Sequence, residues 1–284
     1  TEYQSFALTH GAAYQVAVTR AISSNTTIAN DAAFTIQPKV TIQDQDGNKV
    51  STGSEATLSV VASMSSGLSG TVSMPAVAGV ATFTNLKYTG LIGSKSITYT
   101  LANTAITTNE SFTVTAGAAD HLVVTTEAAG AKSGLAFSTQ PVVTIKDVSE
   151  NTVTDSTLSV ALQASAGTLS GTTTVNAVNG VATFSGVGLS GPAATYQLIY
   201  THIGLGNGLQ TIALAFGNAA QVSIQVASSL VNDTVFATQP VVTIQDAAGN
   251  TITTGSDSTQ RVTLSSSNAT IAGTLFMDAV GGVA

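Results

Sequence analysis

One eleven-residue pattern occurs three times in this chain and constrains its fold more than any other feature. The copies are residues 34–44, 137–147 and 236–246, and all three read Phe-x-x-Gln-Pro-x-Val-Thr-Ile-x-Asp. The first phenylalanines of the copies are 103 and then 99 residues apart. A fixed period of this size predicts tandem copies of one structural unit.

A second pattern sets the boundaries of the units. Gly-Val-Ala-Thr-Phe occupies residues 79–83 and 180–184, and only its first three residues occur in the third copy, at 282–284. The opening stretch, residues 5–13, resembles residues 111–119, which end the first full copy. We therefore predict four segments: the last strand of a preceding or complemented unit at 1–11, full domains at 12–117 and 118–217, and an incomplete domain at 218–284 that lacks its last strands.

The spacing of apolar residues predicts β-strands throughout. Val40 and Ile42 alternate with Thr41, a period of two that turns one side of a strand toward a core. Each full copy has about seven such segments separated by turn signals, as in an immunoglobulin-like sandwich. The predicted fold is all-β: tandem immunoglobulin-like antiparallel sandwiches forming an elongated rod. The predicted core residues are Phe34, Val40, Ile42, Phe83, Phe137, Val143, Ile145, Phe184, Phe236, Val242 and Ile244.

Two further local features carry predictions. A tyrosine in the strand after the second pattern, Tyr99 in the first copy and Tyr196 in the second, predicts a tyrosine corner whose hydroxyl bonds nearby backbone. Glycine supplies the positive φ of the turns after Asp44 and Asp246. Glu150 occupies that position in the second copy, which predicts a looser turn or a turn of another type.

The composition excludes several classes of function. The chain has no cysteine, which removes disulfides and thiolate metal sites. It carries a net charge of −7 with eight scattered basic residues, so nucleic acid is not an expected partner. No apolar run approaches the roughly 18 to 20 residues that span a bilayer. Only 8% of the residues are charged, so Thr, Ser, Asn and Gln must cover most of the surface.

Catalytic and metal-binding patterns are weak. The three histidines are isolated and fit neither a metal site nor a catalytic triad, and the carboxylates form no pair. Asp44, Asp46 and Asn48 resemble the start of a calcium loop and are the candidate calcium ligands, but the bidentate glutamate of such a loop is missing. We therefore predict a turn at this place and no cofactor.

The two patterns together resemble the bacterial immunoglobulin-like repeats of large surface and secreted proteins, including invasin- and intimin-like adhesins. The resemblance extends over nearly the whole chain. It implies an extracellular location and a role as a stalk, spacer or filament part, with ligand binding often placed in a separate tip domain.

The predicted function is a non-enzymatic extracellular structural repeat array, such as a stalk, a surface filament or a surface-layer component. Its expected partners are copies of itself, further repeats of the array, or a host or surface ligand. One alternative is a ligand-binding adhesin region. Another is a filament subunit in which residues 1–11, through Ser5, Phe6 and Leu8, complete the third domain of the next subunit. Such a donor replaces one missing strand, so this alternative requires other contacts as well.

Overall fold

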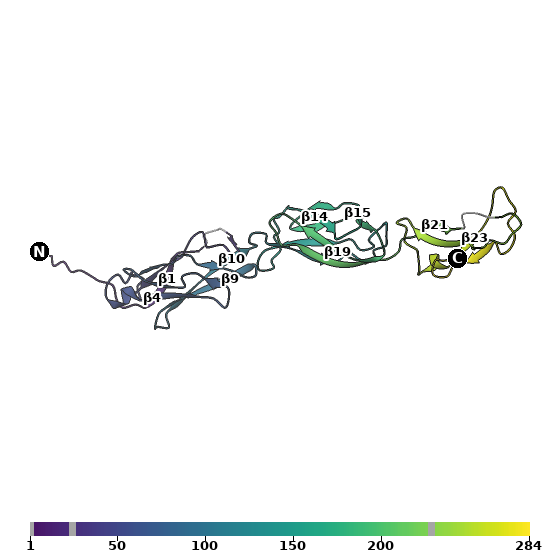
Figure 1. The fold of residues 1–284 in the computed structure, drawn as a ribbon. Helices are drawn as coiled ribbons and strands as arrows, with labels where there is room; N and C mark the ends of the chain where they lie inside the picture. Colours follow the sequence, from purple (N-terminus) through teal and green to yellow (C-terminus); the bar gives the residue numbers. More distant parts are fainter. Residues whose placement is uncertain (1–2, 23–26, 227–230) are drawn as a thin grey trace. The chain divides into compact units, whose positions relative to one another are not determined.

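The computed structural model describes residues 3–22, 27–226 and 231–284, and it consists mainly of short β-strands (Figure 1). The chain divides into two compact units. Unit 1 comprises residues 1–120 and 146–154, and unit 2 comprises residues 121–145 and 155–284. Two single-turn 3-10 helices, Ser54–Thr57 (η1) and Ser256–Thr259 (η2), are the helices in the described ranges. Each unit is described by itself.

Unit 1 contains a three-stranded sheet, a five-stranded sheet and a two-stranded ribbon. The strand orders are β1-β3-β7, β2-β10-β9-β4-β6 and β5-β8. All of the pairs are antiparallel except β2 with β10, which is parallel. The strands are β1 (Gln15–Arg20), β2 (Ile28–Ala29), β3 (Lys39–Gln43), β4 (Ser59–Ser63), β5 (Leu68–Ser69), β6 (Ser73–Pro75), β7 (Val80–Thr82), β8 (Lys87–Tyr88), β9 (Gly93–Leu101) and β10 (Thr107–Thr115).

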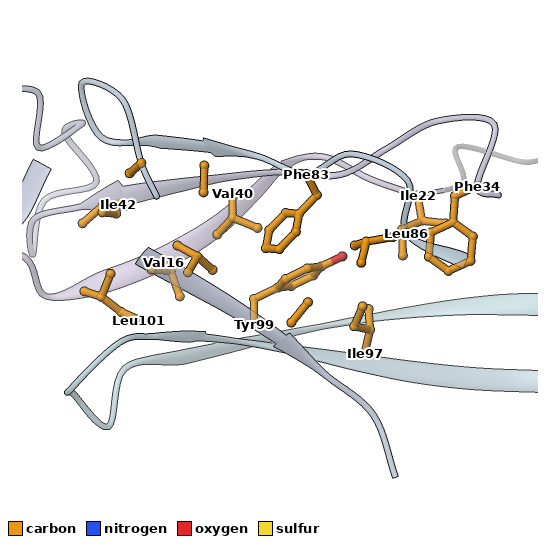
Figure 2. Packing of buried hydrophobic residues seen from close by; sticks show 14 of the residues in the cluster. Val16, Ile22, Phe34, Val40, Ile42, Phe83, Leu86, Ile97, Tyr99 and Leu101 are labelled. Atoms are coloured by element: carbon orange, nitrogen blue, oxygen red, sulfur yellow. The ribbon is translucent and has the colours of Figure 1, made fainter. Parts of the chain in front are cut away.

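The two larger sheets of unit 1 pack face to face around one core. Val40 and Ile42 of β3 point into it from the first sheet, and Leu101 points into it from β9 of the second (Figure 2). The rings of Phe83 and Tyr99 meet between the sheets with their centroids 5.5 Å apart. Unit 1 is therefore built as the antiparallel two-sheet sandwich that the alternation of apolar residues predicts.

Unit 2 repeats this arrangement and adds the third copy of the pattern. Its sheets have the orders β11-β13-β17, β16-β14-β19-β20, β12-β18-β15, β21-β22 and β23-β24. The strands are β11 (His121–Thr126), β12 (Leu135–Ala136), β13 (Val142–Lys146), β14 (Ser159–Ala164), β15 (Thr168–Ser170), β16 (Thr174–Asn176), β17 (Val181–Thr183), β18 (Gly188–Ser190), β19 (Ala194–Thr201), β20 (Gly208–Leu214), β21 (Ala219–Gln225), β22 (Val241–Asp246), β23 (Arg261–Thr263) and β24 (Phe276–Asp278).

Ten of the predicted core residues are buried and one is not. Phe236 is only half-buried, which corrects the prediction for that position. In the first repeat its counterpart Phe34 packs edge-on against Phe112 of β10, with ring centroids 5.4 Å apart. The described part of the third repeat has no strand corresponding to β10, so Phe236 has no such partner. The buried members are Phe34, Val40, Ile42, Phe83, Phe137, Val143, Ile145, Phe184, Val242 and Ile244.

The start of the chain also differs from the prediction. Residues 3–14 form no strand, and the first two residues of the predicted strand at 1–11 lie outside the described residues. Phe6 and Leu8 are 85% and 89% exposed. A strand needs a neighbour to accept its backbone hydrogen bonds, and in a single chain this segment lies beside no sheet.

The tyrosine prediction is corrected in two respects. The hydroxyl of Tyr99 donates to the side chain of Glu110 at 3.0 Å and not to backbone. Its counterpart in the second repeat is Tyr200, which donates to Gln210 at 3.3 Å, and both tyrosines pack against the phenylalanine of the second pattern. Tyr196 lies closer to the start of its strand, and its hydroxyl donates to a backbone carbonyl four residues earlier, at 2.8 Å.

Truncation of the phenylalanine of the second pattern should be costly. We expect Phe83→Ala to lower the free energy of unfolding of the first repeat by about 3–5 kcal/mol, because it leaves a cavity between the two sheets. Phe236→Ala is the matched control, and its half-buried ring should cost clearly less. Native-state hydrogen exchange resolves the repeats from one another; equal losses for the two variants would contradict this account of the core.

Candidate functional site at the repeat junctions

The aspartate that ends each eleven-residue pattern begins a hydrogen-bonded turn. Asp44, Asp147 and Asp246 are all buried. One carboxylate oxygen of Asp147 accepts hydrogen bonds from the backbone N–H groups of Ser149 (2.9 Å) and Asn151 (3.0 Å). The other two aspartates bind the N–H groups two and four residues later in the same way. Aspartate favours such turns because its short side chain can bond its own backbone.

The other oxygen of each carboxylate binds the glycine that leads into the repeat. The N–H groups of Gly11, Gly117 and Gly217 donate to Asp44, Asp147 and Asp246, each at 2.9 Å. The asparagine four residues after each aspartate adds a side-chain hydrogen bond to the same carboxylate, at 3.1, 3.0 and 2.8 Å in chain order. The turn is therefore tied to the entry of its own repeat.

In unit 1 the turn at Asp147 is also held by loops of the first repeat. Asn30 donates to the Asp147 carboxylate at 2.9 Å and accepts a hydrogen bond from the Gly90 N–H at 2.8 Å. Asn151 donates to the Gly90 carbonyl at 3.0 Å and accepts from the Ile92 N–H at 3.1 Å. We call the set Gly117, Asp147 and Asn151, with its partners Asn30 and Gly90, the junction lock.

Unit 2 contains a second junction lock with one substitution. Gly217, Asp246 and Asn250 form the turn, and Asn250 donates to the Gly191 carbonyl at 2.9 Å. Ser133 takes the place of Asn30. Its hydroxyl donates to the Gly191 carbonyl at 2.9 Å and accepts from the Gly191 N–H at 3.2 Å.

Glycine is required at the two locks because backbone approaches backbone there. A Cβ atom at Gly117 would overlap the carbonyl oxygen of Asn30, and one at Gly217 would overlap that of Ser133. At Gly11 a Cβ would meet only the Asp44 side chain, at an ordinary 3.5 Å. The first repeat thus has the same glycine without the same crowding.

The hydrogen bonds keep these aspartates ionised. Burial raises the pKa of Asp147, but the donors on Gly117, Asn151 and Asn30 outweigh it and hold the pKa at about 2. The pKa of Asp246 is lowered in the same way by Asn250 and Gly217. Because the folded pKa of Asp147 lies below its ordinary value of 3.8, this carboxylate stabilises the fold above that pH and loses the contribution as the pH falls toward 2.

The calcium candidates are part of such a turn. Both oxygens of Asp44 accept N–H donors, from Gly11, Asp46 and Asn48, so the carboxylate presents a ring of donors where a cation would need free lone pairs. The side chains of Asp46 and Asn48 are exposed. In the described ranges no three His, Cys, Asp or Glu residues lie together as a metal group. These contacts support the turn interpretation.

The histidines take part in local hydrogen bonds. His10 bonds the Thr52 hydroxyl at 2.9 Å, and His202 bonds the Ser159 carbonyl at 2.7 Å. Neither contact places a nucleophile or a carboxylate on the ring, so the geometry at these two residues is that of surface and strand-end contacts.

Sequence reasoning missed the junction locks and misjudged one turn. The turn at Asp147 has the hydrogen bonds of the other two, so it is neither looser nor of another type. Glu150 adopts φ 64°, close to the φ of Gly47 (83°) and Gly249 (82°), and accepts the strain that glycine avoids. The signal for the locks was the joint recurrence of the glycine, the aspartate and the asparagine; their partner Asn30 lies 117 residues from Asp147 and recurs as Ser133, so no local pattern indicates it.

Comparison with known proteins gives structural neighbours only. No protein-family model and no curated protein sequence matches the chain. The D0–D1 domain of intimin is 18% identical, with a TM-score of 0.27, over 71% of this chain and 98% of its own length. Invasin, a bacterial integrin-binding protein, is 14% identical with a TM-score of 0.37, over 88% of this chain and half of its own length. FdeC, an Escherichia coli adhesin, is 16% identical with a TM-score of 0.37, over 90% of this chain and 85% of its own.

Intimin and invasin are also the proteins that the two sequence patterns resemble. Enzymes occur among the similar structures too: a β-glycosidase from Bacteroides vulgatus is 10% identical with a TM-score of 0.30, over 70% of this chain but 24% of the enzyme. The immunoglobulin-like sandwich is established by the strand pairing and the two-sheet core of the chain itself. The described part of the chain has no helix with the length and hydrophobicity needed to span a bilayer.

The crowding at the first lock can be tested with a matched pair of glycines. We expect Gly117→Ala to cost about 1–3 kcal/mol of stability, because the new methyl group must displace the Asn30 carbonyl. Gly11→Ala should change the stability by less than about 0.5 kcal/mol. Urea unfolding followed by circular dichroism measures both. Equal effects at the two positions would show that the close approach at Gly117 carries no energetic consequence.

Proposed function

We propose that this chain is a non-enzymatic, extracellular structural array in which junction locks couple each repeat to the next. The observation that carries the proposal is the Asp147 carboxylate, which accepts hydrogen bonds from its own turn, from the entry glycine and from the first repeat at once. A linker without such contacts would leave neighbouring domains free to reorient. A charged acceptor with several N–H donors resists separation, since hydrogen bonds to charged groups contribute about 1.5–3 kcal/mol each.

The chain path supports a load-bearing role. The last strand of the first repeat, β10, ends at Thr115, and only one residue separates it from Gly117 in the lock. Tension along the chain would therefore reach the lock without passing through a flexible linker. We propose a semi-rigid rod of this kind as a stalk, a surface filament or a surface-layer component.

The surface chemistry fits the proposed location and partners. A cover of Thr, Ser, Asn and Gln with 8% charged residues offers no basic stripe to a nucleic acid. The partners proposed here are further repeats of the same kind or a host or surface ligand. The resemblance of the two sequence patterns to the repeats of surface and secreted proteins supports an extracellular site of action.

Small-angle scattering tests the coupling in the full chain. We expect the wild type to show a narrow range of maximum dimensions, and Asp147→Ala to broaden it, because Gly117, Asn30 and Asn151 lose their common acceptor. Asp46→Ala removes an exposed carboxylate from the first turn and is the control. Circular dichroism confirms that the sandwiches persist. A wild type as flexible as Asp147→Ala would overturn the proposal.

A ligand-binding adhesin region is the second candidate, favoured by a recurrent exposed valine. Val77, Val178 and Val280 lie before the same two-residue turn in the three repeats, and all three are exposed. A core does not require them, whereas a surface that binds apolar groups would. If they contact a ligand, a triple Val→Ser variant should lose adhesion of the purified chain to epithelial cells while keeping its thermal stability. Unchanged adhesion, or none by the wild type, would exclude this role.

A further inference from the structure

We infer that the two ends of this chain form a head-to-tail docking surface for a second copy of itself. The inference rests on the proposed structural role and names the partner. At the head, the first repeat carries the turn half of a junction lock, Gly11, Asp44 and Asn48. Asn48 is exposed, whereas its counterpart Asn151 in the filled lock is 4% exposed. The first repeat thus presents the lock residues without the loops that fill them.

At the tail, the third repeat carries the complementary residue. The sequence Asn232-Asp233-x-x-Phe236 matches Asn30-Asp31-x-x-Phe34, with Asp233 at φ 57° and Asp31 at φ 61°. Asn30 is the residue that donates to the Asp147 carboxylate. Asn232 is exposed, and its amide donates only weakly, at 3.2 Å, to the adjacent Asp233.

The segment before Gly11 matches the strand that passes between two repeats. Residues 5–9 correspond to residues 111–115 of β10, and Phe112 and Val114 are buried in the first repeat. Thr115 of β10 pairs in parallel with Ala29, and its carbonyl accepts the Asn30 N–H at 3.0 Å. The second repeat makes the same contact, between the Ala215 carbonyl and the Ser133 N–H at 2.9 Å. This pairing uses the residues next to Asn30 and Ser133, which the third repeat also has.

The third repeat exposes the surface on which such a strand would lie. Val222 and Ile224 of β21 are 55% and 56% exposed. The counterparts of Val222, Val16 and Leu122, are buried, and β1 and β11 pack against β10 and β20 respectively. The described part of the third repeat has no strand in the position of β10 or β20, so the apolar side of β21 is uncovered.

These four observations define one contact. The Thr9 carbonyl of one copy accepts the Asn232 N–H of another, Phe6 and Leu8 cover Val222 and Ile224, and the Asn232 amide reaches the Asp44 carboxylate. Head and tail are different surfaces, so the contact is heterologous and extends into linear chains of subunits. Residues 5–9 supply a single strand, and we therefore expect the association to be reversible and dependent on concentration.

Sedimentation velocity across a range of concentrations, with the full chain, tests the inference. We expect the wild type to form species larger than a dimer as the concentration rises. Phe6→Asp should abolish this growth by placing a charge on the apolar side of β21, and Asn232→Ala by removing the lock amide. Both side chains are exposed in the single chain, so its fold is retained. Tyr3→Asp and Asn268→Ala alter exposed residues outside the contact and should assemble like the wild type.

A mixing experiment identifies the polarity of the contact. A Phe6→Asp chain keeps an intact tail and an Asn232→Ala chain keeps an intact head, so an equal mixture should form a heterodimer and nothing larger. A wild type that stays monomeric, or assembly that survives both substitutions, overturns the inference. A monomeric wild type that still shows the narrow scattering profile leaves the proposed structural role standing, whereas a flexible wild type removes that role independently.

Discussion

A buried carboxylate without a cation is the constraint on which the junctions depend. Removing a charge from water costs several kcal/mol unless hydrogen bonds replace the solvent. Asp147 is fully buried, and its replacement donors come from its own turn, from Gly117 and from Asn30. No one of these segments satisfies the carboxylate alone. The turn, the entry into its repeat and the loop of the preceding repeat must therefore be in place together, which couples their folding.

The same dependence on distant segments governs the sandwich core. The eleven-residue pattern brings a phenylalanine and two inward aliphatic residues, but the phenylalanine is buried only when the last strand covers it. Phe34 has Phe112 above it, whereas Phe236 is half-buried and the neighbouring face of β21 is open. The pattern thus specifies the position of a core residue, and the closing strand provides its burial.

This explains which features could be predicted from the sequence. Period-two alternation is local, so the directions of Val40 and Ile42 followed from their neighbours. The turn at Glu150 was misjudged because its hydrogen bonds to Asp147 outweigh the cost of a positive φ. The recurrent Gln of the pattern was read without a role; in the structure Gln37 bonds the Phe34 and Leu86 carbonyls and the Leu86 N–H. Leu86 lies 49 residues away, and a contact over that separation leaves no periodic trace.

The exchange of Asn30 for Ser133 makes the two locks chemically unequal. Asn30 is long enough to reach the carboxylate and adds a donor to it directly. Ser133 is shorter, and its hydroxyl bonds the Gly191 backbone instead, so the carboxylate of Asp246 is reached from the preceding loops only through Asn250. A direct bond to a charged acceptor is stronger than a relay through a neutral amide. The lock in unit 1 therefore resists opening more than the lock in unit 2, and an array built from both types would bend first where serine replaces asparagine.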